Sequence, residues 1–366
     1  MGTLTRTRRR REFARKLAFT VVFFIFCTFA LVNYQRSKGK STDASEQSPD
    51  DNVMNLILSA LGSRNTTAFV KPGQNTLLFD SLILVANNPD KTDNDNRIES
   101  LQADPVKPPL FALVVVISEI GHEEERHVIR ETWYKWTEKE NVRVVFFLGV
   151  PPNQDIQNSG INDEVAEFND VVVDDFEENY YLLSAKVLRM FKWFTTTYPH
   201  EGTRPKFLIK VDHDVFLNIP NLVKHLKREE TQHNVHSDYI GGRLASSTGV
   251  KHNAREDSFI PTELLPDAGY PDYLVGGCYF LQSAVVPRIY EASLGEQLFI
   301  FEDIFLTGMI AHDKLGIQLH DVNPAGIVIA PTFAIRLFGW DSKTGIAYHP
   351  ANAKLMKQYF EEANKV

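Results

Sequence analysis

Two acidic pairs in the sequence are spaced in ways that could support chemistry. Asp212 and Asp214 follow the apolar run Phe207–Val211, which predicts a buried strand. Carboxylates at i and i+2 of an extended chain point to the same side, and at the carboxyl edge of a parallel sheet they face the crevice where ligands bind. Like charges this close repel unless a cation lies between them, so the pair predicts a site for a hard divalent cation that also holds a diphosphate. An ordinary surface turn is the alternative.

The second pair, Glu302 and Asp303, precedes the apolar helical pattern of residues 304–310. Acidic residues at a helix start are also explained by ordinary helix-terminus electrostatics. A histidine, His349, lies just before the last predicted helix, residues 351–363. A lone histidine is more often structural or exposed than a ligand, so these positions alone leave both interpretations open.

Basic residues and glycines complete the set of candidates. Arg126 and Arg130 follow the first predicted strand, where α/β nucleotide-binding folds place the nucleotide base, and Lys186 is a weaker candidate for contact with the nucleotide. The alternative is a helix that packs Ile129 and Trp133 inward and leaves its arginines in solvent. The pairs Gly276-Gly277 and Gly241-Gly242 allow close backbone approach to a sugar or simply a tight turn.

The elements that would position these residues alternate between strands and helices. Apolar runs predict strands at 110–118, 142–150, 171–174 and 206–211, and helical spacing occupies 123–136 and 180–194. Asn218 is a predicted helix N-cap with Pro220 in the first turn. Strands that alternate with helices of this length imply crossover units, so the predicted fold class is α/β with a central, mostly parallel sheet.

Composition limits the protein class. The chain has 366 residues, 43% of them hydrophobic and 23% charged, which excludes a wholly disordered chain and a multi-span membrane protein. Two cysteines, Cys27 and Cys278, are too few for a disulfide framework or a thiolate zinc site. The net charge of −8 would repel phosphate backbones, so nucleic-acid binding is not expected.

The N-terminal charge and hydropathy pattern predicts a membrane anchor. Residues 1–16 hold seven basic side chains and one acid, and the apolar segment 17–34 is long enough to cross a thin bilayer once. The positive-inside rule then places the tail 1–16 in the cytosol and the body in the lumen. A cleaved signal peptide is the alternative, but no convincing small-x-small site follows.

Polar composition predicts a lumenal stem at 35–106, with short order possible around 56–61 and 77–85. The chain's only N-x-[ST] sequon begins at Asn65 and is a candidate glycosylation site that agrees with a lumenal location. The folded, catalytic domain is predicted to occupy 107–366.

From Phe111 to His349 the chain resembles the beta-1,3-galactosyltransferase and beta-1,3-N-acetylglucosaminyltransferase family, glycosyltransferase family 31. Six segments carry the resemblance in the family's order: Arg126–Trp133, Val145–Gly149, Asp175–Lys186, Asp212–Asn218, Tyr270–Tyr279 and Glu302–Gly308. The sequence departs from the family at His213, often aspartate there, at Leu182, often asparagine, and at Cys278, usually a small residue. None of these changes removes a residue that the chemistry needs.

The resemblance implies a GT-A-like domain that transfers galactose, N-acetylglucosamine or N-acetylgalactosamine from a UDP-sugar to a glycan hydroxyl, with inversion and in β1,3 linkage. It implies Asp303 as the general base, Glu302 as an acceptor- or donor-binding neighbour, and Gly276 and Gly277 near the sugar. It also implies His349 as a third metal ligand beside Asp212 and Asp214, one of which could instead contact the donor's ribose. The expected cofactor is Mn2+ or Mg2+, since an imidazole ligand favours Mn2+.

The same resemblance implies a single-pass type II Golgi membrane protein that acts on a glycoprotein or glycolipid acceptor. It leaves open whether the protein forms a homodimer. Three other classes of protein share part of this pattern. An aspartyl-phosphate phosphatase would use Asp212 as a nucleophile but usually has Thr or Val where this chain has Phe216. A glycosidase could pair Asp303 with Asp212. A non-catalytic sugar-binding protein would not need both acidic pairs.

Overall fold

The computed structural model describes residues 65–80, 109–151, 160–232, 238–246, 269–322, 326–329 and 341–365. All of them belong to one compact unit, Val53–Val366. Within these ranges no helix combines the length and the apolarity that a membrane crossing requires. The predicted tail 1–16, the predicted anchor 17–34 and most of the predicted stem lie outside them.

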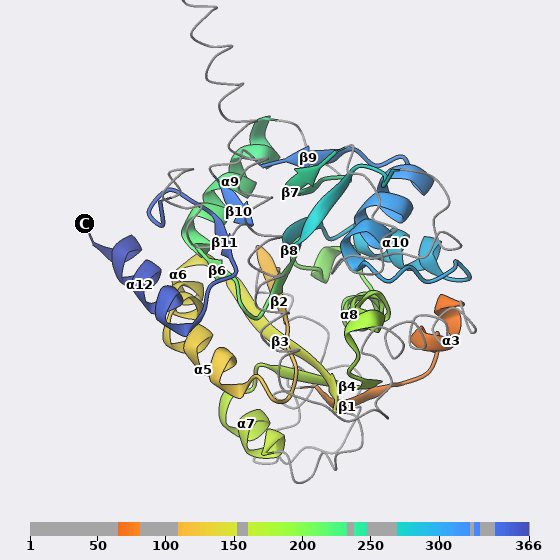
Figure 1. Ribbon diagram of the computed structural model, residues 1–366, viewed down its shortest axis with the longest axis horizontal. Helices are drawn as coiled ribbons and strands as arrows, with labels where there is room; N and C mark the ends of the chain where they lie inside the picture. The colour runs from red at the N-terminus through yellow and green to blue at the C-terminus, as the bar shows by residue number, and fades with distance from the viewer. Residues whose placement is uncertain are drawn as a thin grey trace, which may run out of the picture. The chain divides into compact units, whose positions relative to one another are not determined.

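An eight-stranded sheet forms the centre, in the order β1-β4-β3-β2-β5-β8-β7-β9 (Figure 1). Its strands are β1 (Leu77–Asp80), β2 (Ala112–Ile117), β3 (Val142–Val150), β4 (Val171–Glu177), β5 (Phe207–Asp212), β7 (Ile240–Ala245), β8 (Tyr273–Gln282) and β9 (Leu319–Asp321). Strands β4, β3, β2 and β5 are mutually parallel, as predicted. The sheet as a whole is mixed, because β1, β8 and β7 form antiparallel pairs.

A second, three-stranded sheet has the order β10-β11-β6. Its strands are β6 (Phe216–Leu217), β10 (Ile327–Ile329) and β11 (Ala347–His349). Because β11 ends at His349 and pairs with β6, which follows Asp214 by two residues, this small sheet brings the C-terminal histidine to the acidic turn.

Helices cover both faces of the large sheet (Figure 1). They are α3 (Thr66–Val70), α5 (Glu123–Glu131), α6 (Thr137–Glu140), α7 (Ile161–Phe168), α8 (Leu183–Thr197), α9 (Ile219–Gln232), α10 (Val285–Ser293), the π-helix Ile304–Lys314 and α12 (Ala353–Asn364), with 3-10 turns at Trp133–Trp136, Tyr180–Leu182 and Glu201–Thr203. One core packs α5, α7, α9, α12 and the small sheet, and the other packs α3, α8, α10 and the π-helix.

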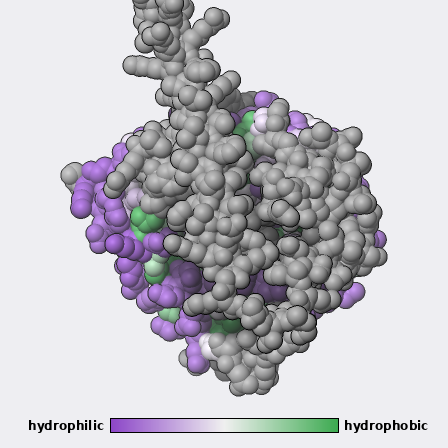
Figure 2. Space-filling model, in the orientation of Figure 1, coloured by the Kyte–Doolittle hydropathy of each residue, from purple (hydrophilic) through white to green (hydrophobic). Residues whose placement is uncertain are grey.

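The two cores explain the continuous apolar runs in the sequence. Along β2, Ala112, Val114 and Val116 enter one core, and the alternate residues Leu113 and Val115 enter the other. A strand buried on both faces has no polar side, so its sequence does not alternate. In contrast, the described part of the surface in Figure 2 is mostly hydrophilic.

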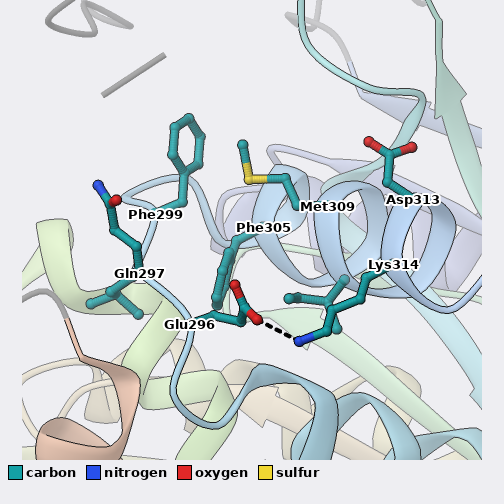
Figure 3. A pocket seen from close by; sticks show the side chains of 9 residues that line it. Glu296, Gln297, Phe299, Phe305, Met309, Asp313 and Lys314 are labelled. Atoms are coloured by element: carbon teal, nitrogen blue, oxygen red, sulfur yellow. Dashed lines mark hydrogen bonds and ion pairs between the residues drawn. The ribbon is translucent and has the colours of Figure 1, made fainter. Parts of the chain in front are cut away.

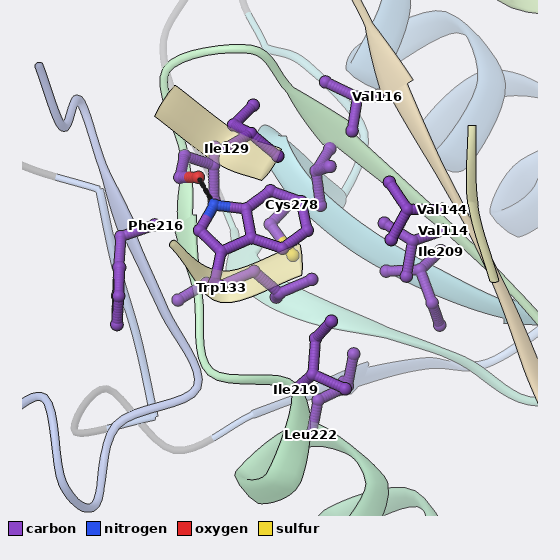
Figure 4. Packing of buried hydrophobic residues seen from close by; sticks show 14 of the residues in the cluster. Val114, Val116, Ile129, Trp133, Val144, Ile209, Phe216, Ile219, Leu222 and Cys278 are labelled. Atoms are coloured by element: carbon purple, nitrogen blue, oxygen red, sulfur yellow. Dashed lines mark hydrogen bonds between the residues drawn. The ribbon is translucent and has the colours of Figure 1, made fainter. Parts of the chain in front are cut away.

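The helix predicted at 123–136 is interrupted. α5 ends at Glu131, and the backbone at Thr132 leaves the helical region before the 3-10 turn. Trp133 is fully buried, and its Nε1 donates to the Val215 carbonyl at 3.1 Å (Figure 4). The break in the helix thus coincides with the point where the indole enters the core.

Residues 65–80 lie in the range predicted to be stem, and the structure places them in the folded unit. The Asn65 side chain caps α3 by accepting from the Thr67 N–H at 2.8 Å, and the Thr66 hydroxyl donates to the Ser293 carbonyl at 2.7 Å. β1 pairs with β4 as the edge of the large sheet. The folded domain therefore includes residues upstream of the predicted start at 107.

Candidate active site

The candidate site lies where several distant elements end. Asp212 is the last residue of β5. It pairs in register with Ile117, the last residue of β2. Asp303 caps the π-helix, His349 ends β11, and Gly276 lies within β8. The carboxyl edge of the parallel strands is thus the place where the predicted residues meet, as open α/β sheets generally arrange their ligand sites.

Asp212, Asp214 and His349 form a group that could hold a metal ion. Each offers one ligand atom, and these atoms lie within 4.8 Å of one another. The reason for their convergence differs from the prediction. β5 ends at Asp212, and the chain turns there, with the Val215 N–H donating to the Asp212 carbonyl at 3.2 Å. The turn, rather than an extended i, i+2 alternation, therefore brings the two carboxylates together.

The third member of the group contacts one carboxylate directly. His349 Nε2 lies 3.1 Å from Asp214 Oδ1. Burial opposes protonation of the imidazole, but the hydrogen bond and charge of Asp214 outweigh it and raise the pKa of His349. Burial would likewise raise the pKa of Asp214, but His349 lowers it overall. Two carboxylates and an imidazole fit Mn2+ by donor chemistry, because carboxylates suit hard divalent ions and an imidazole favours the transition metal.

Asp303 is held by backbone N–H groups. Its Oδ2 accepts from the Gly276 N–H and its Oδ1 from the Ile304 N–H, both at 2.9 Å. Burial raises the pKa of Asp303, against these two bonds and the nearby charge of Lys210. A carboxylate with fixed orientation and a raised pKa is suited to accept a proton near neutral pH.

The two glycines of β8 allow the side chains of Asp303 and His349 to lie against the strand. A Cβ at Gly276 would be 3.3 Å from Asp303 Oδ2, and a Cβ at Gly277 would be 3.1 Å from His349 Cγ. The sequence predicts that these glycines either allow the backbone to approach a sugar closely or form a tight turn. In the structure they lie in a strand and accommodate protein side chains. Gly241 and Gly242 of β7 similarly accommodate neighbouring side chains, with Phe280 and Tyr279 of β8 among them.

Glu302 faces the interior rather than a position open to an acceptor. It is 3% exposed. Its Oε1 accepts from the Tyr279 hydroxyl, and its Oε2 lies 3.3 Å from Lys210 Nζ. Burial raises the pKa of Glu302 to about 7. Because the side chain is almost fully buried, with one oxygen bonded to Tyr279 and the other paired with Lys210, the structure supports a positioning role and not the predicted contact with donor or acceptor.

Lys210 is the site residue that the sequence analysis missed. It is 1% exposed in the middle of the site, and its Nζ donates to Asp212 Oδ1 at 2.7 Å and to the Gly276 carbonyl at 2.6 Å. Burial would lower the pKa of Lys210, but the charges of Asp212 and Glu302 raise it. A lysine inside an apolar strand was the available signal, since lysine is almost never fully buried without a partner.

The predicted donor-binding arginines have other partners. Arg126 is fully buried, and its five N–H groups are all used. They donate to both oxygens of Glu164 at 2.7 and 2.6 Å, to Ser118 Oγ and to the carbonyls of Glu119 and Ile120. Arg126 therefore has no donor left for a nucleotide, which corrects its predicted role.

Arg130 is also committed to carboxylates. It donates to both oxygens of Asp170 at 2.9 and 2.7 Å and to Glu164 Oε1 at 2.8 Å. Its guanidinium also stacks over the Phe168 ring at 4.0 Å from the centroid. Only 8% of its side chain is exposed, so the structure gives no support for the predicted nucleotide contact. The alternative of solvent-exposed arginines is equally wrong.

Lys186 lies near the same sheet edge but is buried beneath it. Its Nζ donates to the Ser118 carbonyl at 2.6 Å and to Glu178 Oε1, which also accepts from the Gly149 N–H. Burial lowers the pKa of Lys186 despite this carboxylate. These bonds join the ends of β2 and β3, so Lys186 supports the edge rather than facing a donor.

His213, at the middle of the acidic motif, stacks on His122 with ring centroids 4.0 Å apart. Burial and then His122 lower the pKa of His213. The stack joins the acidic turn to the residue that precedes α5. The departure from the family's usual aspartate thus has a local packing partner.

A separate hollow lies between residues 296–299 and the π-helix (Figure 3). Phe299, Phe305 and Met309 supply apolar lining, and Glu296 pairs with Lys314 across it. None of the predicted site residues lines this hollow. It is therefore distinct from the candidate site.

The sequence is similar to those of known glycosyltransferases. The family model described as "Galactosyltransferase" matches residues 124–323. The chain is 29% identical over 243 residues to a Xenopus tropicalis lactosylceramide 1,3-N-acetyl-beta-D-glucosaminyltransferase, covering 63% of this chain and 58% of that protein. It is 30% identical over 233 residues to human N-acetyllactosaminide beta-1,3-N-acetylglucosaminyltransferase 4, covering 62% and 56%. Mouse beta-1,3-galactosyltransferase 1 is 29% identical over 208 residues, covering 56% and 61%.

The chain thus spans less than two thirds of the length of these relatives. Among solved structures, it is similar to the galactosyltransferase LgtC in complex with donor and acceptor sugar analogues, with a TM-score of 0.38 and 9% identity, covering 69% of this chain and 97% of that one. A TM-score of this size supports no conclusion. The family model, in contrast, spans more than half of the 366 residues, and the chain therefore belongs to the galactosyltransferase family, glycosyltransferase family 31.

Proposed function

We propose that the protein is an inverting, GT-A-like transferase that moves galactose, N-acetylglucosamine or N-acetylgalactosamine from a UDP-sugar to an acceptor-glycan hydroxyl in β1,3 linkage. One observation carries this proposal: two consecutive residues of β8 connect the base to the metal group. Gly276 donates to Asp303, and Gly277 packs against His349. The acceptor is a glycan on a glycoprotein or glycolipid, as expected from the relatives.

In this proposal Asp212, Asp214 and His349 hold Mn2+ or Mg2+. The ion would neutralise charge on the departing diphosphate. Asp303 accepts the proton of the acceptor hydroxyl through a carboxylate oxygen while that hydroxyl oxygen bonds to the anomeric carbon and the bond to the diphosphate breaks. The Gly276 and Ile304 N–H groups keep the carboxylate oriented. A single displacement inverts the anomeric centre.

The decisive variant is Asp303→Asn, which preserves volume but removes the base. We expect kcat to fall by roughly 10²–10⁴, the usual contribution of general-base catalysis, while UDP-sugar affinity changes little. The matched control is Asp313→Asn, the same substitution at an exposed position near the other end of the π-helix. Unchanged kcat in Asp303→Asn, or a glycosyl adduct trapped on Asp303, would contradict the role.

We also propose a single-pass type II location in the Golgi membrane with the folded unit in the lumen. The basis is the basic tail 1–16 followed by the apolar segment 17–34. Asn65 is exposed, and only its side-chain oxygen caps α3, so its nitrogen can carry a glycan. Protease added to sealed Golgi vesicles should spare the body, and Asn65→Gln should remove one glycan's mass. A secreted product beginning near residue 33 would refute this topology.

A further inference from the structure

We propose that Lys210 is a positioning residue that sets the placement of the metal carboxylate Asp212 relative to the base Asp303. The inference rests on the proposed function, because it assigns a task to a residue that touches neither the reacting sugar nor the metal. Its basis is a buried network of hydrogen bonds and ion pairs that connects Asp212 of the metal group to Asp303.

The ammonium of Lys210 has three oxygen partners. Its Nζ donates to Asp212 Oδ1 at the end of β5 at 2.7 Å and to the Gly276 carbonyl in β8 at 2.6 Å, and it forms an ion pair with Glu302 Oε2, next to the π-helix, at 3.3 Å. Two of its three N–H donors are thus used in hydrogen bonds, and the third contact is electrostatic. Lys210 therefore connects the end of β5, strand β8 and the start of the π-helix, which carry Asp212, Gly276 and Asp303.

Each contact acts on a functional neighbour. Holding Asp212 Oδ1 leaves Oδ2 to face a cation. Gly276 is held by its carbonyl while its N–H donates to Asp303, so the residue that orients the base is itself anchored by Lys210. Glu302, adjacent to Asp303 in the chain, is fixed by Lys210 from one side and by the Tyr279 hydroxyl from the other.

Burial makes the network sensitive to the loss of its cation. Lys210 and Glu302 are 1% and 3% exposed, so water does not solvate either group well. A buried charge is tolerated only when its partners are in place, and removing one partner leaves the others uncompensated. Loss of the ammonium would leave Asp212 and Glu302 free to rotate or to bind a proton, and Gly276 without its anchor.

The test is Lys210→Met, which keeps the length of the side chain and removes the charge. Its matched control is Lys206→Met: Lys206 is 52% exposed, pairs with Glu230 on the surface and precedes the same strand. We expect Lys210→Met to weaken Mn2+ binding to the donor-free protein by about 10–100-fold, measured by electron paramagnetic resonance of free Mn2+, and to lower kcat by a similar factor. Lys206→Met should change neither, and Lys210→Arg should recover part of both losses.

A purely structural lysine would give a different pattern: a lower melting temperature, with Mn2+ affinity and kcat of the folded protein unchanged. That pattern, or tighter Mn2+ binding in Lys210→Met, overturns the proposal. If Lys210→Met does not fold, Tyr279→Phe probes the network from its other end. We expect it to lower kcat about tenfold with a KM for UDP-sugar close to that of the wild type; unchanged kcat overturns the proposal. Absence of Mn2+ binding in the wild type would instead refute the proposed metal site.

Discussion

Two clusters of charged residues in this molecule differ in burial and in charge balance. The first, the arginine cluster, consists of Arg126, Arg130, Glu164 and Asp170. The second, the site cluster, consists of Lys210, Asp212, Asp214, Glu302, Asp303 and His349. In the arginine cluster two guanidinium groups match two carboxylates. In the site cluster four carboxyl groups face one lysine and one histidine.

We interpret the arginine cluster as a structural ion network and the site cluster as the one that serves the proposed function. Arg126 donates to both oxygens of Glu164 and gives its other three N–H groups to Ser118 and two carbonyls, so none is left for a ligand. Surplus carboxylates at strand ends create a negative site that a divalent cation would neutralise. Charge surplus at the sheet edge is therefore a better guide to function here than the presence of arginines.

The largest effect expected from this comparison is on activity. Asp214→Asn should reduce transfer roughly 10³-fold or more, because a metal supplies several kcal/mol of charge stabilisation to the transition state. Its melting temperature in chelator should change little, since Asp214 is 33% exposed and the substitution removes both its pairing with His349 and its repulsion from Asp212. Asp170→Asn, in the arginine cluster, should do the reverse: a lower melting temperature with transfer per folded molecule retained. Initial rates and calorimetry on both variants check this contrast. Activity of Asp214→Asn in excess chelator would contradict the prediction.

Next in size is the stability effect of the arginine cluster. Arg126→Met leaves Glu164 buried without its bidentate partner, and breaking such a pair costs about 3–5 kcal/mol of unfolding free energy. Urea denaturation measures this loss. The matched control is Arg228→Met, whose side chain is 60% exposed and whose removal should cost less than about 0.5 kcal/mol. A fall in UDP-sugar affinity with stability unchanged would restore Arg126 as a donor-binding residue.

The smallest effect concerns pH. Because burial raises the pKa of Glu302 to about 7, the folded state favours its neutral form. Its contribution to stability is therefore complete below its ordinary pKa of 4.5 and is lost as pH rises through about 7. We expect the unfolding free energy of metal-free wild type to fall across this range by about one to three kcal/mol more than that of Glu302→Gln. Denaturation in chelator at pH 5 and pH 8 measures the difference, with the exposed Glu296→Gln as control; parallel pH profiles for wild type and Glu302→Gln would refute it.

Much of the fold can be predicted from the sequence because its central strands are buried on both faces. The runs predicted at 142–150 and 206–211 correspond to β3, Val142–Val150, and β5, Phe207–Asp212. The N-cap predicted at Asn218 is confirmed, with its Oδ1 accepting from the Asn221 N–H at 3.0 Å. The antiparallel direction of β8 relative to β5 was not accessible, since strand direction depends on connections and not on local pattern.

The site was accessible in part for a similar reason. The positions of Asp212, Asp303 and His349 at element ends follow from local pattern and the family resemblance. The roles of Arg126 and Lys210 depend on partners far along the chain: Glu164 lies 38 residues from Arg126, and Gly276 lies 66 from Lys210. A charge's partner at such a separation is decided by topology, which residue type and spacing do not reveal.

The folded residues 65–80 set the boundary for a soluble catalytic fragment. Arg189 donates to the Phe69 carbonyl at 2.7 Å, and Trp193 Nε1 donates to Asp80 at 2.9 Å, while β1 covers the edge of β4. A secreted fragment cut at residue 107 would expose that edge, and exposed sheet edges pair with other chains. A fragment that begins before Asn65 keeps this edge covered, and we expect it to purify without aggregation and in active form.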